Sequence, residues 1–269
     1  MYKYNKSNKL RVFTAFAGYD SQCLALNRLK EHYPDFDYEL VGWSEFDPES
    51  KSPLERQPAI IAHNALFPQW SDRNYGDICQ IDWENVPDFD LFTYSFPCQS
   101  VSAAGKMAGL EKGSGTRSSL LWECEKAIVA RKPKYLLLEN VKNLLSKKFR
   151  PFYLEWVGVL DKLGYETFTQ IVNAKDMGVP QNRERVFGVS ILRTDDDPSP
   201  IYNFPKPFPL ERRLKDVLEE KVDEKYYLSD KMLDYFNRVN DDKTHHHDFN
   251  PTDGGGAMPA PSEQHQETE

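Results

Sequence analysis

The sequence predicts an α/β protein with a mostly parallel sheet and helices on both of its faces. Short runs rich in apolar, β-branched and aromatic residues alternate with segments of helical periodicity from residue 10 to residue 192. This order is typical of parallel sheets. In addition, the run KYLLLENV is almost continuously apolar, as a strand buried on both faces is. Ligands of such sheets bind at the carboxyl ends of the strands.

The individual elements follow from the local patterns. LRVFTAF is a strand-like run that precedes a turn of small residues and a helical segment, and YELVGWSEF is the next such run. DLFTYSF ends at a proline, and ETFTQIV and RVFGVSIL add two further runs with strand composition. We expect strands at 10–16, 38–46, 90–96, 134–141, 166–172 and 185–192, and helices at 21–32, 60–67, 118–131 and 153–163.

The composition is that of a globular protein with one large or two modest domains. The chain has 269 residues, of which 39% are hydrophobic and 28% charged. No stretch of about 18 apolar residues exists, so we expect no membrane span. The N-terminal MYKYNKSNKL has no apolar core, which argues against a signal peptide. The four cysteines form no CxxC pair, and this favours the reducing cytoplasm.

The net charge of −8 is spread unevenly along the chain. From Asp241 to the end, seven acidic residues stand against Lys243, whereas basic residues cluster at 131–134 and 142–150. The total charge therefore neither supports nor excludes a nucleic-acid partner. The segment from 241 to 269 is polar and rich in glycine and proline, and we expect it to be disordered. A folded domain is expected over 1–200, followed by a charged, partly helical segment at 201–240.

Reactive side chains stand at the ends of the predicted strands. Cys98 follows a strand and a proline, and Glu139 ends the strand that is otherwise apolar. Arg183 and Arg185 begin the last predicted strand. An isolated cysteine is more often a small buried hydrophobic residue, but a carboxylate at the end of a buried strand is costly unless it faces a site. We therefore expect the thiol, the carboxyl and the guanidinium groups to form one active site.

These residues belong to motifs that resemble those of the cytosine-C5 DNA methyltransferases, in the same order along the chain. The match runs from about residue 10 to residue 230. The nucleophile motif corresponds to Phe96-Pro97-Cys98-Gln99, with Ser102 and Gly105 in the following loop, and further motifs correspond to Arg117-Ser118-Ser119-Leu120, Glu139-Asn140-Val141 and Gln181-Asn182-Arg183-Glu184-Arg185. The resemblance implies the Rossmann-like fold of S-adenosylmethionine-dependent methyltransferases.

The resemblance also implies a binding site for S-adenosylmethionine, with S-adenosylhomocysteine as its product. Phe16-Ala17-Gly18 matches the start of the family's glycine turn, but Asp20 replaces the second glycine. An ordinary strand-to-helix turn with Asp20 or Ser21 as the N-cap is the alternative interpretation, and a glycine favours close approach of the backbone to a ligand. The donor-binding residues expected are Phe16, Gly18, Glu45, Phe46, Asp77, Ile78, Pro97 and Leu120.

The implied substrate is double-stranded DNA, from which the target cytosine is flipped into the site. Cys98 would add to carbon 6, Glu139 would hold ring nitrogen 3 and the exocyclic amine, and Arg183 would stabilise the oxygen side of the ring and help position Cys98. Arg185 is predicted to be catalytic as well. Gln99, Ser102 and Gln181 are expected to contact DNA. No metal is expected, because the adjacent histidines at 245–247 lack ligand spacing, and Cys23, Cys79 and Cys124 are expected to pack in the interior.

In family terms, 1–200 is the catalytic domain and 201–240 is a linker or the start of a recognition region. A target-recognition domain and a closing motif are not recognisable, so the recognition part could come from a second polypeptide. We expect the isolated chain to bind the donor weakly and to methylate DNA poorly or not at all. The expected location is the bacterial cytoplasm or nucleoid. The alternatives are a tRNA cytosine-C5 methyltransferase, a non-catalytic DNA- or partner-binding remnant, and a nicotinamide-dependent oxidoreductase, which leaves Cys98 without a role.

Overall fold

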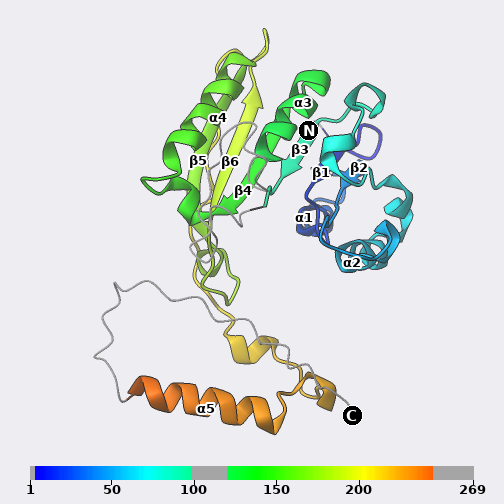
Figure 1. Ribbon diagram of the computed structural model, residues 1–269. Coiled ribbons are helices and arrows are strands. Elements are labelled where there is room, and N and C mark those ends of the chain that lie inside the picture. The colour runs from blue at the N-terminus through cyan, green and yellow to red at the C-terminus, as the bar shows by residue number, and fades with distance from the viewer. Residues whose placement is uncertain (1–3, 98–119, 245–269) are drawn as a thin grey trace. The chain divides into compact units, whose positions relative to one another are not determined.

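The computed structural model describes residues 4–97 and 120–244 (Figure 1). The chain divides between Glu211 and Arg212 into two units. The first unit contains a six-stranded sheet in the order β2-β1-β3-β4-β6-β5. Its strands are β1 (Leu10–Ala15), β2 (Tyr38–Ser44), β3 (Leu91–Tyr94), β4 (Tyr135–Val141), β5 (Tyr165–Asn173) and β6 (Glu184–Leu192). Its α-helices are α1 (Ser21–His32), α2 (Pro58–Leu66), α3 (Leu121–Arg131) and α4 (Arg150–Lys162).

The predicted strands and helices are confirmed, with shifts at their ends. The helix predicted at 153–163 begins at Arg150, because Pro151 lies in its first turn, where a missing backbone N–H costs nothing and the fixed φ suits a helix. The strand predicted at 90–96 ends at Tyr94, just before the segment that leads to Pro97. The predicted helix start at 118 lies outside the described residues.

The sheet is mostly parallel, as predicted, but the strand β6 runs in the opposite direction to the other strands. β1 pairs in parallel with β2 and β3, and β3 pairs in parallel with β4. β6 runs antiparallel to both of its neighbours, β4 and β5. The beginning of β6 therefore lies beside the carboxyl end of β4, where Val141 pairs with Arg185. This reversal brings a strand start to the edge where parallel sheets bind ligands.

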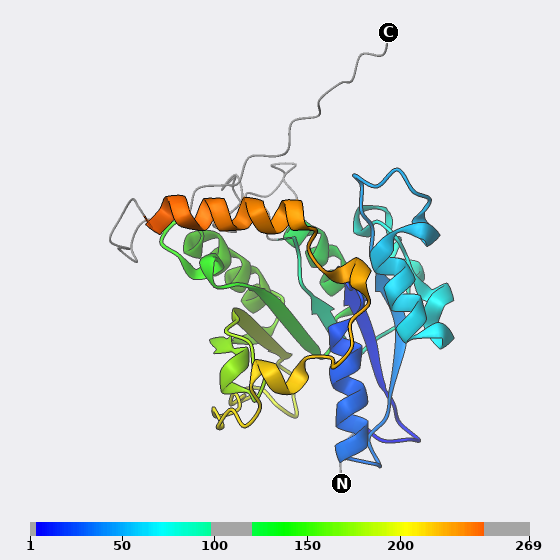
Figure 2. The same cartoon turned by 90° about the horizontal axis from the view of Figure 1, so that it is seen from below.

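Helices cover both faces of the sheet, which confirms the predicted α/β class. Neighbouring residues of a strand point to opposite faces, and in β1 Val12 packs in one apolar cluster while Phe13 packs in the other. The cluster around Phe13 includes Trp122 of α3 and Trp156 of α4, and the cluster around Val12 includes residues of α1 and α2. Figure 2 shows α3 and α4 on one side of the sheet and α1 on the other.

The described part of the second unit contains two short turns and one α-helix, and the side chains of residues 212–238 are exposed. Two 3-10 turns, Leu214–Val217 and Glu224–Tyr226, precede α5 (Asp230–Thr244). The helix thus extends a few residues past 240, where disorder was predicted to begin, and residues 245–269 lie outside the described part. Within the described residues, the helices are too short or too polar to cross a membrane.

Candidate active site

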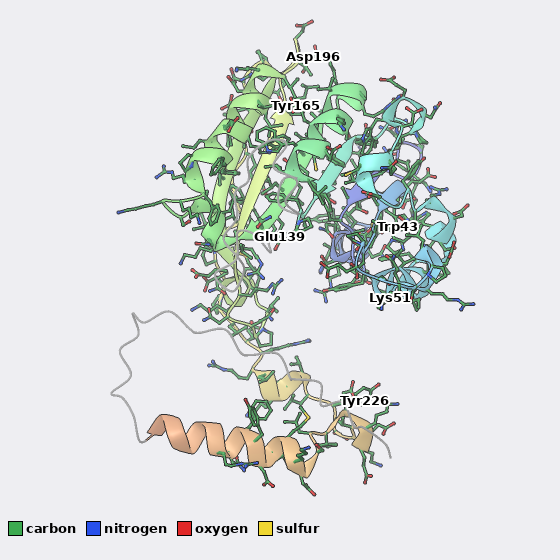
Figure 3. The ribbon with its side chains drawn as sticks, viewed as in Figure 1. Trp43, Lys51, Glu139, Tyr165, Asp196 and Tyr226 are labelled. Carbon is green, nitrogen blue, oxygen red and sulfur yellow. The ribbon has the colours of Figure 1, made fainter. Side chains whose placement is uncertain are left out.

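The carboxylate of Glu139 forms an ion pair at the carboxyl end of β4. Leu138 and Asn140 are buried, and Glu139 points to the opposite face with 28% of its side chain exposed. The Nε atom of Arg185 lies 3.1 Å from Oε1 of Glu139. Glu139 pairs with Phe187 across the ladder, so Arg185 is its diagonal neighbour, within reach of a long side chain. Figure 3 labels Glu139 near the end of β4.

The neighbouring Asn140 ties β4 to the segment that leads to Cys98. Its buried side chain donates a hydrogen bond from Nδ2 to the carbonyl oxygen of Phe96 at 3.0 Å and accepts one from the N–H of Val141. The polypeptide two residues before Cys98 is therefore held against the strand that carries Glu139. Cys98 itself, together with Gln99 and Ser102, lies outside the described residues. A buried amide in an otherwise apolar strand was a signal for this role, which sequence reasoning did not use.

The two arginines of the predicted site have different positions. Arg183 is exposed in the connection between β5 and β6, and Arg185 is half-buried against Glu139. Both line a cavity of about 390 Å³ at the carboxyl edge of the sheet, beside an ion pair of 2.9 Å between Lys142 and Glu184. The residues lining this cavity are Val141, Lys142, Asn143, Gln181, Asn182, Arg183, Glu184 and Arg185.

A second cavity, of about 400 Å³, lies at the carboxyl ends of β1, β2 and β3. The residues lining it are Phe16, Ser44, Glu45, Phe46, Pro48, Gly76, Asp77, Ile78, Cys79, Ser95, Pro97 and Leu120. Every donor-binding residue predicted from the sequence is among them except Gly18. Sequence reasoning missed Ser44, Pro48, Gly76, Cys79 and Ser95. Ser44 and Ser95 were detectable in principle, since each lies within two residues of the end of a predicted strand.

Gly18 acts on this cavity through Glu45. Its N–H donates a hydrogen bond of 2.8 Å to Oε2 of Glu45, which orients the carboxylate that lines the cavity. Gly18 has a φ of 58°, a conformation that glycine adopts without the steric cost of a Cβ atom. A Cβ atom added there would meet nothing within 4 Å, so the positive φ, and not a close neighbour, favours glycine at this position.

Asp20, which stands at the family's second glycine position, is a structural residue. It has a φ of 62° and is the N-cap of α1, as one of the two interpretations predicted. Oδ1 accepts a hydrogen bond from the N–H of Cys23, and Oδ2 accepts one from Thr14 Oγ1 at 2.8 Å. His63 Nε2 lies 3.6 Å from Oδ2. These bonds supply the partners that a buried carboxylate requires.

Asp77 and Ile78, which were predicted to bind the donor, begin a short 3-10 turn on the wall of the cavity. Asp77 Oδ1 accepts a hydrogen bond from the N–H of Cys79 at 3.0 Å. The packing role predicted for Cys79 is wrong, because its side chain is exposed, whereas Cys23 and Cys124 are buried as predicted. Partial burial, with the nearby carboxylates of Asp77 and Glu123, raises the pKa of Cys79 to about 11, since both effects disfavour the thiolate.

Comparison with known proteins identifies the family. A profile of the C-5 cytosine-specific DNA methylase family matches residues 10–260. The chain is 40% identical over 266 residues to the type II methyltransferase M2.ScrFI of Lactococcus lactis subsp. cremoris, covering 83% of this chain and 71% of that protein. It is 32% identical over 275 residues to the orphan methyltransferase M.SssI of Spiroplasma monobiae, covering 84% of this chain and 69% of that protein.

Solved structures share the fold at low sequence identity. The S. pombe Dnmt2 methyltransferase superposes with a TM-score of 0.58 at 19% identity, covering 86% of this chain and 66% of that chain. A Spodoptera frugiperda DNMT2 variant gives a TM-score of 0.61 at 19% identity, covering 85% of this chain and 65% of that one. The family profile spans most of the sequence, and together with the similarity to M2.ScrFI it shows that this chain belongs to the C-5 cytosine-specific DNA methylase family.

Proposed function

We propose that this chain transfers a methyl group from S-adenosylmethionine to carbon 5 of a flipped cytosine in double-stranded DNA, through a covalent adduct with Cys98. The observation that carries the proposal is the ion pair between Glu139 and Arg185 at the end of β4. The next residue of β4, Asn140, holds the main chain of Phe96, two residues before Cys98. A carboxyl and a nucleophile on one sheet edge suit covalent catalysis with proton transfer.

The cavity at the ends of β1, β2 and β3 suits the methyl donor. Its volume of about 400 Å³ lies within the range of small-molecule sites. The carboxylates of Glu45 and Asp77 offer acceptors for ribose hydroxyls and an adenine amino group, and Phe16 and Ile78 offer apolar surface to an aromatic base. When bound, S-adenosylmethionine supplies an electrophilic methyl group on a positively charged sulfur. Pro97, beside Cys98, lines the same cavity, so the two reacting centres would be neighbours.

Carbon 5 of cytosine is a poor nucleophile, and in this proposal the side chains of Cys98 and Glu139 make it reactive. The Cys98 thiolate forms a bond to carbon 6, and the electron pair of the 5,6 double bond makes carbon 5 nucleophilic. The Glu139 carboxyl holds ring nitrogen 3 and the exocyclic amine and shares a proton as negative charge develops in the ring. After carbon 5 has gained the methyl group, a base removes its proton and the bond between carbon 6 and Cys98 breaks. The cytosine ring is restored and Cys98 is free for another turnover.

The arginines have separate tasks in this proposal. Arg185 holds the Glu139 carboxyl in one orientation, as its Nε–Oε1 distance of 3.1 Å supports. Arg183 lines the adjoining cavity and is proposed to stabilise the oxygen side of the ring and to help position Cys98. Gln181 lines the same cavity, and we propose that it contacts DNA together with Gln99 and Ser102.

Covalent trapping tests the proposal, because a single turnover gives a signal even if the isolated chain methylates DNA poorly. Duplex DNA containing 5-fluorocytosine is incubated with the chain and S-adenosylmethionine, and the adduct is detected by denaturing electrophoresis. We expect an adduct with the wild type and none with Cys98→Ser, while both proteins gain thermal stability from S-adenosylhomocysteine. No adduct with the wild type, or an equal adduct with Cys98→Ser, would overturn the proposal. An adduct with 5-fluorocytosine tRNA but not with DNA would favour the tRNA alternative.

A further inference from the structure

The connection between β5 and β6 carries Gln181 and Arg183, and Asn173 organises it. Asn173 is the last residue of β5, and its Oδ1 atom accepts hydrogen bonds from the N–H of Lys175 at 3.2 Å and from the N–H of Arg183 at 3.0 Å. Its Nδ2 atom donates to Oδ1 of Asn182 at 2.8 Å. The side chain thus bridges the two ends of the connection.

The main chain of Arg183 is held on both of its polar groups. Its N–H donates to the Asn173 side chain, and its carbonyl oxygen accepts a hydrogen bond of 3.0 Å from the N–H of Ala174. The exposed Arg183 side chain, which lines the cavity beside Arg185, therefore leaves from a fixed Cα atom. Fixing the root of a long side chain reduces the entropy lost when its guanidinium binds.

The ordinary interpretation is that Asn173 only caps the short 3-10 turn Ala174–Asp176. Asp82 provides a comparison, because it caps the turn Trp83–Asn85 through Glu84 N–H and also accepts a hydrogen bond from the side chain of Asn85. These hydrogen bonds of Asp82 join residues at most three positions apart, whereas Asn173 accepts a hydrogen bond from Arg183, ten residues away. Capping the turn does not require the hydrogen bond between Asn173 and the N–H of Arg183.

The rest of the connection is fixed independently of Asn173. The N–H of Phe208 donates to the carbonyl oxygen of Asp176 at 3.0 Å. The ring of Phe208 covers Gly178, so closely that a Cβ atom there would lie 2.7 Å from Phe208 Cε2. Loss of the Asn173 side chain should consequently loosen Asn182 and Arg183 while the remainder of the connection stays in place.

We infer that Asn173 is a positioning residue of the methyltransferase reaction, which acts by holding the main chain of Arg183 so that the guanidinium faces the substrate. The inference rests on the function proposed above, in which Arg183 stabilises the cytosine ring. Asn173 itself does not line the cavity, and its effect on the reaction should pass entirely through Arg183.

The first measurement is amide hydrogen exchange at Arg183, which reports its hydrogen bond without requiring activity. We expect exchange at Arg183 to be at least tenfold faster in Asn173→Ala than in the wild type. Asn173→Asp keeps the Oδ1 acceptor and should restore most of the protection. Asp82→Ala is the matched control, since it removes a comparable cap outside the site, and it should leave exchange at Arg183 unchanged. Unchanged exchange in Asn173→Ala would overturn the inference.

The second measurement is a double-mutant cycle on the rate of covalent trapping with 5-fluorocytosine DNA. We expect Asn173→Ala and Arg183→Ala each to slow trapping at least tenfold, and the double variant to be no slower than Arg183→Ala alone. Affinity for S-adenosylhomocysteine should stay at the wild-type value. Additive losses would mean that Asn173 acts independently of Arg183 and would also overturn the inference. Absence of trapping in the wild type would instead refute the proposed function and, with it, the role of Asn173 in the reaction, whereas exchange at Arg183 would still show whether Asn173 holds the main chain of Arg183.

Discussion

Arg185 and Glu139 form an ion pair of 3.1 Å although their strands run in opposite directions. The antiparallel pairing of β6 with β4 places Arg185 opposite Val141, so that its side chain reaches back diagonally to Glu139. The pair is partly exposed, at 22% and 28% of the two side chains, and contributes little to stability by itself. Its value is geometric, because a planar guanidinium restricts the orientation of a carboxyl group.

Removing either partner of this pair should slow methyl transfer. We expect Glu139→Gln to lower the single-turnover rate about 100-fold or more, because general acid–base groups contribute that much. Arg185→Lys should cause a smaller loss, since a lysine keeps the charge but not the planar geometry. Rapid-quench methylation of duplex DNA measures both. Arg193→Lys, which alters an exposed ion pair with Asp161, is the control. Near-normal rates in Glu139→Gln would refute its catalytic role.

Glu45 should determine much of the affinity for the donor. Its carboxylate accepts a hydrogen bond from the N–H of Gly18, which orients it in the cavity. In the proposed function this carboxylate also accepts hydrogen bonds from the donor, and a hydrogen bond to a charged group contributes about 1.5–3 kcal/mol. We therefore expect Glu45→Ala to weaken binding of S-adenosylhomocysteine at least tenfold in calorimetry. Glu45→Gln keeps an acceptor for Gly18 and should lose less. Glu49→Ala, a nearby exposed acid that does not line the cavity, should bind normally. Equal affinity of Glu45→Ala and the wild type would show that the donor binds elsewhere.

Cys79 allows the donor cavity to be probed by pH. Its pKa is raised to about 11, so the thiol is protonated at neutral pH and the reactive thiolate increases as the pH rises towards that value. In the Cys98→Ser variant, we expect alkylation of Cys79 by iodoacetamide to accelerate about tenfold per pH unit between pH 7 and 9.5. S-adenosylhomocysteine should slow it. Peptide mass spectrometry measures the rate of alkylation. A plateau of this rate near pH 9 would contradict the raised pKa of Cys79, and a lack of protection by S-adenosylhomocysteine would contradict donor binding in this cavity.

Asp20 should stabilise the protein through its buried hydrogen bonds and because aspartate tolerates a left-handed backbone better than most residues. Asp20→Ala loses the helix cap and the bond to Thr14, and alanine is less tolerant of a φ of 62° than aspartate. Together these losses should cost about 3 kcal/mol. Asp20→Gly tolerates the backbone conformation and should cost less, and Asp20→Asn least. Urea unfolding gives the order. A glycine variant less stable than the alanine variant would exclude the backbone contribution.

The strands, the helices and some of the residues that line the two cavities could be predicted because their signals are local. A β-branched and aromatic run predicts β1, and a nearly continuous apolar run predicts β4, without knowledge of their partners. The motif around Glu139 is contiguous in the chain. The N-cap at Asp20 was also predictable, since an acid before a helical segment can reach the next free N–H groups. The hydrogen bond between Asn173 and Arg183 and the one between Asn140 and Phe96 were not predicted, because the two partners of each lie far apart in the sequence.

By itself, the sequence determined the α/β class, the family resemblance, and the placement of Glu139, Arg183 and Arg185 near the carboxyl end of β4. The tertiary structure decided that β6 runs antiparallel, that Arg185 contacts Glu139, and that Cys79 is exposed and lines the cavity at the ends of β1, β2 and β3. The physical reason is that periodicity reports which face of an element is apolar. Strand direction and register, in contrast, depend on packing between distant segments of the chain. The direction and register of β6 decide that Arg185, and not Arg183, contacts Glu139.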